Sequence, residues 1–94
     1  MTSRFSNHLL RSLRNELPIA RVLEVLELPV KTSEGYVRFL CPQCREFNTA
    51  TKRETNLARC FRCEENFNPI DLVIAARRWT FFQAIAYLED LRWL

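Results

Sequence analysis

The residues best suited to chemistry are four cysteines, arranged as two Cys-x-x-Cys pairs in a chain with no other cysteine. Cys41 and Cys44 form the first pair and Cys60 and Cys63 the second, with 15 residues between the pairs. One tight turn can bring two thiolates to the same ion, and two such turns fill the tetrahedron that zinc prefers. Disulfides are the weaker expectation, and a redox-active pair would not need a duplicate. The sequence therefore predicts one structural Zn²⁺ bound by all four thiolates.

A zinc ion surrounded by four sulfurs has no open position for water or substrate, which a catalytic zinc requires. The single histidine, His8, precedes Cys41 by 33 residues and is expected at the surface. The sequence contains no acid pair, glycine-rich phosphate loop or activated nucleophile that would suggest another active site. We therefore expect a protein that is not an enzyme. Arg45, Arg59 and Arg62 are expected to offset the negative charge of the thiolates.

The composition predicts one small folded domain with a basic bias. The 94 residues are 48% hydrophobic and include a single glycine, which excludes a low-complexity chain. No apolar run approaches the ~20 residues that span a bilayer, so we expect no membrane association. Twelve of the 14 basic residues are arginines, and the formal net charge is +3. Guanidinium groups suit contacts with phosphates and bases, so this bias is a weak indication of nucleic-acid binding.

Other segments must position the cysteines, and the first of them is residues 1–17. Phe5, Leu9 and Leu13 recur at helical spacing, which predicts an amphipathic helix that packs on the domain or on a partner. The arginines of this segment, with no acid before Glu16, are also typical of an organellar transit peptide. Import into an organelle is therefore a second interpretation. The apolar pattern continues past Glu16 without a break typical of a processing site, which favours the packed helix.

A second helix and a short antiparallel sheet are expected before the second cysteine pair. The elements are a helix from Pro18 to near Pro29, a turn at 31–35, a strand at 36–40, a polar hairpin or loop at 45–56 and a return strand at 57–60. Proline suits the first turn of a helix, and YVRFL alternates as a half-buried strand does. Both cysteine pairs then lie at strand ends.

After the second pair the chain is expected to become helical. Asn68 and Pro69 suit the N-cap and the first helical position, with Asp71 two residues later. Thr80 and Gln83 form a capping box that opens the last helix. The buried stripes are expected at Ile70, Val73 and Ile74 in the first of these helices, and at Phe81, Ala84, Ile85 and Leu88 in the second.

The predicted architecture is α+β: a small zinc ribbon flanked by helices, with residues 1–17 as an N-terminal helix and residues 18–94 as the zinc-binding domain. From Ile19 to Leu91 the chain resembles the zinc-binding domain of bacterial and phage DNA primases. The matching pieces, in order, are Gly35-Tyr36, CPQC (41–44), CFRC (60–63), NPIDLV (68–73) and FFQAIAYL (81–88). Their order and spacing are more specific than a bare four-cysteine pattern.

The sequence departs from the primase pattern in three ways. Most such domains have histidine at the position of Cys44, whereas the phage branch resembles this chain in having cysteine there. The segment FNTATKRE (47–54) replaces the usual Thr-Pro-Ser-Phe segment. Arg62, Glu64 and Phe67 replace glycines of the family. The sequence ends at Leu94, where a primase would continue into its catalytic domain, so we expect either an excised piece or a free-standing relative that acts in trans.

The resemblance implies binding of single-stranded template DNA and support of primer synthesis in the cytoplasm of a bacterial or phage-infected cell. A separate polymerase, primase catalytic subunit or helicase would then be the partner. The candidate DNA contacts, which combine charges for phosphates with rings for stacked bases, are Tyr36, Arg38, Lys52, Arg53, Arg59, Phe61 and Arg62. Each also has an ordinary structural interpretation, with Phe61 in the core and Tyr36 covering a sheet edge.

A second interpretation is a zinc-stabilised adaptor that contacts proteins without binding DNA. Aromatic residues crowd the C-terminal part of the chain: Trp79, Phe81, Phe82, Tyr87 and Trp93. Aromatic side chains that a small core cannot bury often mark interfaces, and Trp79 and Trp93, at helix ends, are expected to be the most exposed. A partner is expected to dock there or on the N-terminal helix around Leu9, Leu10 and Leu13.

Overall fold

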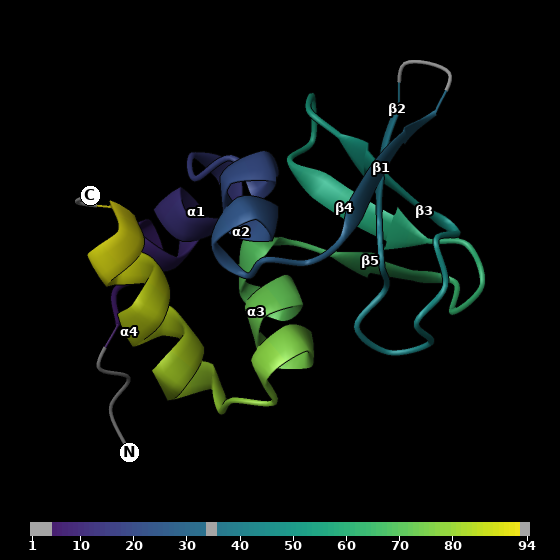
Figure 1. Cartoon of the computed structure of the whole chain (residues 1–94). Coiled ribbons are helices and arrows are strands. Elements are labelled where there is room, and N and C mark those ends of the chain that lie inside the picture. The colour runs from purple at the N-terminus through teal and green to yellow at the C-terminus, as the bar shows by residue number, and fades with distance from the viewer. Residues whose placement is uncertain (1–4, 34–35, 93–94) are drawn as a thin grey trace.

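The computed structural model describes residues 5–33 and 36–92, and the chain divides into a helical end and a strand-rich end (Figure 1). The elements are α1 (Asn7–Asn15), α2 (Ile19–Val25), β1 (Val30–Ser33), β2 (Tyr36–Phe39), β3 (Thr49–Lys52), β4 (Leu57–Cys60), β5 (Glu65–Phe67), α3 (Pro69–Arg77) and α4 (Phe81–Arg92). The fold is α+β, as the sequence predicts. Among the described residues, no helix combines the length and the apolar character needed to cross a membrane.

Two antiparallel sheets form the strand-rich end. β1 pairs with β2 in one sheet, and β4 lies between β3 and β5 in the other. Side chains link the sheets where β2 and β3 meet, among them Arg38, whose guanidinium group donates to the Thr49 carbonyl at 3.3 Å. The hydroxyl of Thr49 accepts a hydrogen bond from the Phe39 amide at 2.7 Å and donates one to the Phe39 carbonyl at 2.6 Å.

Two of the strands carry no clear sequence signal. The turn predicted at 31–35 is wrong in its first part, because Val30–Ser33 forms β1, while residues 34–35 lie outside the described part of the chain. The first three residues of β1 are exposed, so this strand lacks the apolar alternation of a half-buried strand. The strand β5, in a region predicted to become helical, has three residues, of which only Phe67 is buried, and its backbone pairing to β4 defines it.

One face of the three-stranded sheet is buried and the other is open. Side chains alternate along a strand and cross-strand neighbours share a face. The buried face includes Thr49, Ala58, Cys60 and Phe67, each at most 2% exposed. The open face carries Ala50, Lys52, Leu57, Arg59 and Asn66. The helices complete the core with residues such as Leu13, Val22, Leu72, Ile85 and Leu88.

The predicted starts of α3 and α4 are confirmed. The Asn68 side chain accepts a hydrogen bond from the Asp71 amide at 2.8 Å, and the Asp71 carboxylate accepts one from the Asn68 amide at 3.2 Å. Thr80 and Gln83 make the same reciprocal pair at 2.9 and 3.2 Å. These boxes satisfy backbone donors that a helix start leaves unpaired. The helix α2 ends short of the predicted position near Pro29, because the backbone turns left-handed just after it.

A side chain from the strand-rich end holds the junction of α1 and α2. Pro18, predicted to be the first residue of α2, is instead the N-cap of that helix, and its side chain makes no capping hydrogen bond. The Oδ1 atom of Asn56 instead accepts a hydrogen bond from the Ile19 amide at 2.8 Å. The Nδ2 atom of Asn56 donates to the carbonyls of Arg14 and Leu17 at 2.8 and 2.7 Å. One side chain in the β3–β4 turn therefore ties both helices to the sheet.

The N-terminal helix predicted from the sequence packs on the domain itself. Leu13, expected at a partner surface, is fully buried in the common core. The helix α1 lies against α3 and α4, while Leu9 and Leu10 are partly exposed. His8 is exposed, as predicted. A partner can therefore reach Leu9 and Leu10 but not Leu13 without disturbing the core.

Two expectations for aromatic residues are wrong. Phe81, expected in the buried stripe of α4, is 43% exposed, and Phe82 is 46% exposed. The two rings lie 6.4 and 5.5 Å from the ring of Phe5. Trp79, expected to be among the most exposed, is half-buried with its ring 5.2 Å from that of Tyr87. The smaller aliphatic residues of α4 already fill its buried face, so adjacent phenylalanines cannot both turn inward.

Candidate metal centre and adjoining sheet surface

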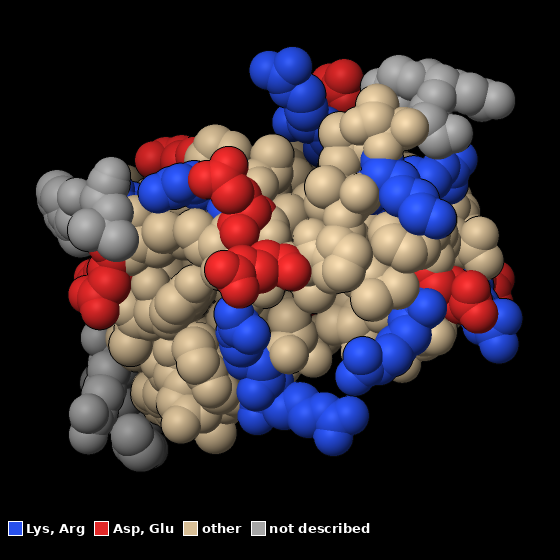
Figure 2. Space-filling view, viewed as in Figure 1, with Lys and Arg blue, Asp and Glu red and all other residues tan. Residues whose placement is uncertain are grey.

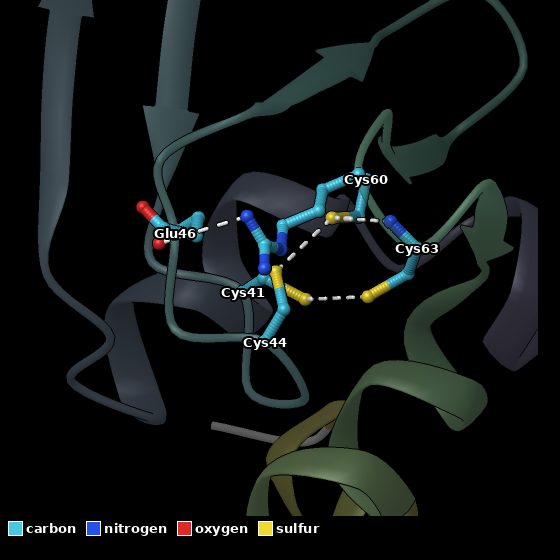
Figure 3. A network of polar contacts seen from close by, with 6 residues as sticks. Cys41, Cys44, Glu46, Cys60 and Cys63 are labelled. Carbon is cyan, nitrogen blue, oxygen red and sulfur yellow. Dashed lines mark hydrogen bonds and ion pairs between the residues drawn. The ribbon is translucent and has the colours of Figure 1, made fainter.

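The four cysteine side chains converge between the two Cys-x-x-Cys turns (Figure 3). Their Sγ atoms all lie within 4.8 Å of one another, with Cys41 and Cys63 at 3.9 Å and Cys44 and Cys60 at 3.6 Å. Sulfurs at ~2.3 Å from a tetrahedral zinc ion are ~3.8 Å apart, so the arrangement fits zinc. A disulfide needs ~2.05 Å, and all four cysteines are free thiols. The four cysteines form a site that can hold one structural zinc ion, as their spacing predicts.

The two turns share one backbone feature. Cys41 follows β2 and Cys60 ends β4. The residue after each second cysteine has a left-handed backbone, with φ 60° at Arg45 and 57° at Glu64. The Arg45 amide donates to the Cys41 carbonyl at 2.9 Å, and the Cys63 amide donates to the Cys60 sulfur at 3.4 Å. Left-handed backbone costs a non-glycine residue about 1–2 kcal/mol, so the surrounding fold must impose it at both turns.

The thiols differ in how readily they lose protons. Burial, and then hydrogen bonds with the neighbouring thiols, raise the pKa of Cys63 to about 12. Burial likewise raises the pKa of Cys41. Burial also acts to raise the pKa of Cys60, but hydrogen bonds, the strongest from the Cys63 amide, outweigh it, so that this pKa is lowered. Since zinc binds thiolates, ion binding must displace protons from Cys41 and Cys63.

The arginines expected to offset the thiolate charge do not all face the site. The Nη1 atom of Arg62 lies 4.0 Å from Oε1 of Glu46, an ion pair that links the two turns (Figure 3). Both partners are exposed, so water screens the pair. Arg59 lies on the opposite face of β4 from Cys60 and donates to the Asn66 side chain at 3.3 Å. The expected role of Arg59 at the metal is therefore wrong, because strand alternation turns its side chain away.

Four of the seven candidate DNA contacts line one groove of about 760 Å³ along the open face of the three-stranded sheet. These four are Lys52, Arg53, Arg59 and Phe61. Arg38 is half-buried and donates to the Thr49 carbonyl at 3.3 Å, so its guanidinium group supports the fold. Arg62 lies at the metal turn, outside the residues that line the groove. The side chain of Tyr36 and residue Trp93 lie outside the described part of the chain.

Phe61 is exposed at the edge of this groove. Its side chain is 56% exposed, so the alternative that places it in the core is wrong. The Phe61 amide donates to the Asn48 carbonyl at 2.7 Å, which fixes the backbone that carries the ring. The guanidinium carbon of Arg59 lies 5.7 Å from the ring centroid. A flat apolar surface and a positive charge are therefore adjacent at this edge.

The groove also contains residues that the sequence did not single out. Val37 from β2, Ala50 and Leu57 provide apolar walls, and Asn66 from β5 adds an amide. Side chains alternate between the two faces along 49–52 and 57–60. This alternation would predict that Ala50 and Leu57 share a face, but only if the strand β3 and its register were known. Figure 2 shows lysine and arginine side chains interspersed with acids over the visible face. The groove itself is lined by three cationic side chains, Lys52, Arg53 and Arg59, and by one acid, Glu54.

No protein-family model and no characterised protein sequence matches this chain. The resemblance to the primase domain rests on the motifs and their order.

Proposed function

We propose that this protein is a zinc-stabilised, non-catalytic module that binds single-stranded DNA through the open face of its three-stranded sheet. The observation that carries the proposal is the groove in which an exposed ring, Phe61, lies beside Arg59, with Lys52 and Arg53 on the same walls. Proteins bind single strands by stacking bases on aromatic rings and placing cations near the phosphates. The groove offers both.

The exposed ring favours a single strand over a duplex. Bases in a duplex are already stacked and paired, so Phe61 offers them little additional contact. An unpaired base can stack on the ring while Lys52 and Arg53 contact the neighbouring phosphates. The groove is lined by strands and a turn, so binding would not require a helix to enter a duplex groove.

The biological role that we propose is support of primer synthesis by a catalytic partner in trans. The primase-like order of motifs from Ile19 to Leu91 supports this role, and a site filled by four sulfurs suits structure rather than catalysis. The partner would be a polymerase, a primase catalytic subunit or a helicase. The module would hold the template strand, and the partner would extend a primer on it.

The test of DNA binding is a fluorescence anisotropy titration with a labelled single strand and with the duplex of the same sequence, at several salt concentrations. We expect tighter binding of the single strand and a log-log salt slope of about −2, since each of three phosphate contacts contributes ~0.7. Phe61→Ala should weaken binding by about 5- to 150-fold, the equivalent of 1–3 kcal/mol for one stacked base.

Matched control variants separate the groove from the rest of the surface. Phe82→Ala removes a ring of comparable exposure, 46%, from α4, and Arg21→Ala removes an exposed arginine from α2. Neither should change binding, whereas Arg53→Ala should weaken it for all sequences alike. Equal affinity for single strand and duplex, or equal effects of Phe61→Ala and Phe82→Ala, would refute the groove as the DNA site.

A primer-synthesis assay tests whether the protein is non-catalytic and acts with a partner. The purified protein, with nucleotides, Mg²⁺ and template, should make no primer. Addition of a replicative polymerase or primase catalytic subunit from the same source should start synthesis or change its start sites. Primer synthesis by the protein alone, lost in a Cys60→Ala preparation made in parallel, would show that it is an enzyme after all.

A second candidate function is contact with another protein, which the exposed rings of Phe81 and Phe82 favour, together with the partly buried Phe5 beside them on the helical end. The test is co-purification of the tagged protein with replication proteins, compared with a Phe82→Ser variant. Loss of a partner in the variant, with unchanged DNA binding, would assign the cluster to protein contact.

A further inference from the structure

The two halves of the metal site come from two different sheets. Cys41 follows β2, which pairs with β1, while Cys60 ends β4, which pairs with β3 and β5. No ladder pairing joins β2 to β3 among the strands that the structure describes. Something other than sheet pairing must therefore set the distance between the first and second cysteine pairs.

Thr49 lies where the two sheets meet. Its side chain is fully buried, and its hydroxyl makes two short hydrogen bonds, at 2.7 Å from the Phe39 amide and at 2.6 Å to the Phe39 carbonyl. One hydroxyl thus satisfies both backbone polar groups of a buried residue. A threonine hydroxyl has a single proton to donate, and that proton is committed to this contact.

The register places this contact directly between the ligands. Thr49 is the cross-strand partner of Cys60, and Phe39 lies two residues before Cys41. A short path, from Cys60 to Thr49 to Phe39 to Cys41, therefore joins a ligand of the second turn to a ligand of the first. Each step of this path is a backbone pairing, a hydrogen bond or a two-residue segment of chain.

We propose that Thr49 is the positioning residue of the metal centre: its hydroxyl holds β2 against β3 at the separation that lets all four sulfurs meet one ion. Removal of the hydroxyl leaves the amide and the carbonyl of Phe39 buried without partners, which is unfavourable. The strand β2 would shift toward other hydrogen-bonding groups, and Cys41 would move with it. Residues outside the ligand set that orient ligands typically change metal affinity by about 10- to 100-fold, and we expect an effect of that size here.

The experiment uses the full chain and two metals. Zinc affinity is measured by competition with a chromogenic chelator, and the geometry of the site is reported by the thiolate-to-metal and d–d absorption bands of the Co²⁺-loaded protein. Thr49→Val keeps the shape of the side chain and removes the hydroxyl, whereas Thr49→Ser keeps the hydroxyl. Valine should weaken zinc binding by about 10- to 100-fold and change the Co²⁺ bands, and serine should restore both.

Two controls distinguish positioning from a general loss of stability. Thr51→Val makes the same change two residues along the same strand face, at a hydroxyl with no hydrogen bond in the described structure, and should leave both readouts unchanged. Asn56→Ala destabilises the fold from the opposite end of the β3–β4 hairpin, and its Co²⁺ bands should match those of the unmodified protein.

Results for the valine and serine variants decide whether Thr49 positions the metal ligands. Thr49→Val with normal Co²⁺ bands, and with zinc affinity no lower than that of Asn56→Ala, would overturn the proposal and make Thr49 an ordinary core contact. Should the valine variant fail to fold even with excess zinc, the serine variant decides alone. A serine variant with altered bands, despite its retained hydroxyl, would overturn the proposal.

Discussion

The side chain of Asn56 offers the most direct test of how this small fold is held together. Its three hydrogen bonds, at 2.8, 2.8 and 2.7 Å, join the β3–β4 turn to the end of α1 and the start of α2. Each contributes ~1 kcal/mol net, and a buried group left unpaired adds to the loss. Alanine also tolerates the left-handed backbone at φ 55° less well than asparagine does. We therefore expect Asn56→Ala to lower the free energy of unfolding by about 3–4 kcal/mol.

Asn56→Asp is the sharper variant, because it changes one atom group and keeps the shape of the side chain. The acceptor for the Ile19 amide remains, but the donor to the carbonyls of Arg14 and Leu17 becomes an oxygen. An oxygen facing two carbonyl oxygens is repulsive, so aspartate should destabilise the protein at least as much as alanine at neutral pH. Asn66→Ala removes an exposed asparagine with one side-chain bond at 3.3 Å and should cost less than ~0.5 kcal/mol.

The assay is urea unfolding at a fixed concentration of free zinc, since zinc binding stabilises the folded state by mass action. Limited proteolysis provides a second readout, because release of the α1–α2 junction should speed trypsin cleavage after Arg11 and Arg14. Stability of Asn56→Asp equal to that of the unmodified protein would refute the reasoning. So would a loss below ~0.5 kcal/mol in Asn56→Ala, equal to that of the control.

Four further predictions follow from the metal centre and the helix caps. Cys44→His should still bind zinc, because position 44 is half-exposed and has room for the larger ligand, whereas Cys60→His, at a fully buried position, should lose zinc by metal analysis. Removal of zinc by a chelator should abolish the ribbon, with loss of circular dichroism signal and a lower melting temperature, because zinc can supply roughly 10–16 kcal/mol in small domains. Zinc affinity should fall with acid by at least about 100-fold per pH unit between pH 7 and 5. Free thiols carry their protons in this range, and burial raises the pKa of Cys41 and Cys63 further in the folded site, so two or more protons leave on binding. A slope below two protons in chelator competition across this range would contradict the idea. Asn68→Ala, which opens the α3 capping box, should cost about 1 kcal/mol in urea unfolding, and a value near zero would mean that water replaces the cap.

Much of the metal site could be predicted from the sequence because its chemistry is local. A Cys-x-x-Cys spacing places two thiols in one turn whatever the rest of the chain does. Two such turns, in a chain with no other cysteine, supply the four ligands of one structural zinc site. The caps at Asn68 and Thr80 are local in the same sense, since each depends on residues three apart. The helices α3 and α4 therefore start where the sequence indicates.

The tertiary structure decided the features that depend on long-range pairing. The strands β1 and β5 are defined by their backbone pairing with β2 and β4. The polar residues of β1 show no apolar alternation from which a strand could be predicted. The seven candidate DNA contacts also separate only in three dimensions, since strand register sends Arg59 to the groove and a hydrogen bond to Thr49 holds Arg38 in the fold.

Two side-chain ties between distant segments could not be seen in the sequence. Asn56 reaches residues about forty positions away, with separations of 37, 39 and 42 residues, and Thr49 reaches Phe39 across ten. Neither residue belongs to a motif, and each is an ordinary polar residue in a polar segment. The sequence determined the ligands and the helix starts, because those depend on neighbours along the chain. Only the folded chain decided which polar side chains would be buried, because burial and partner choice depend on segments that meet only after folding.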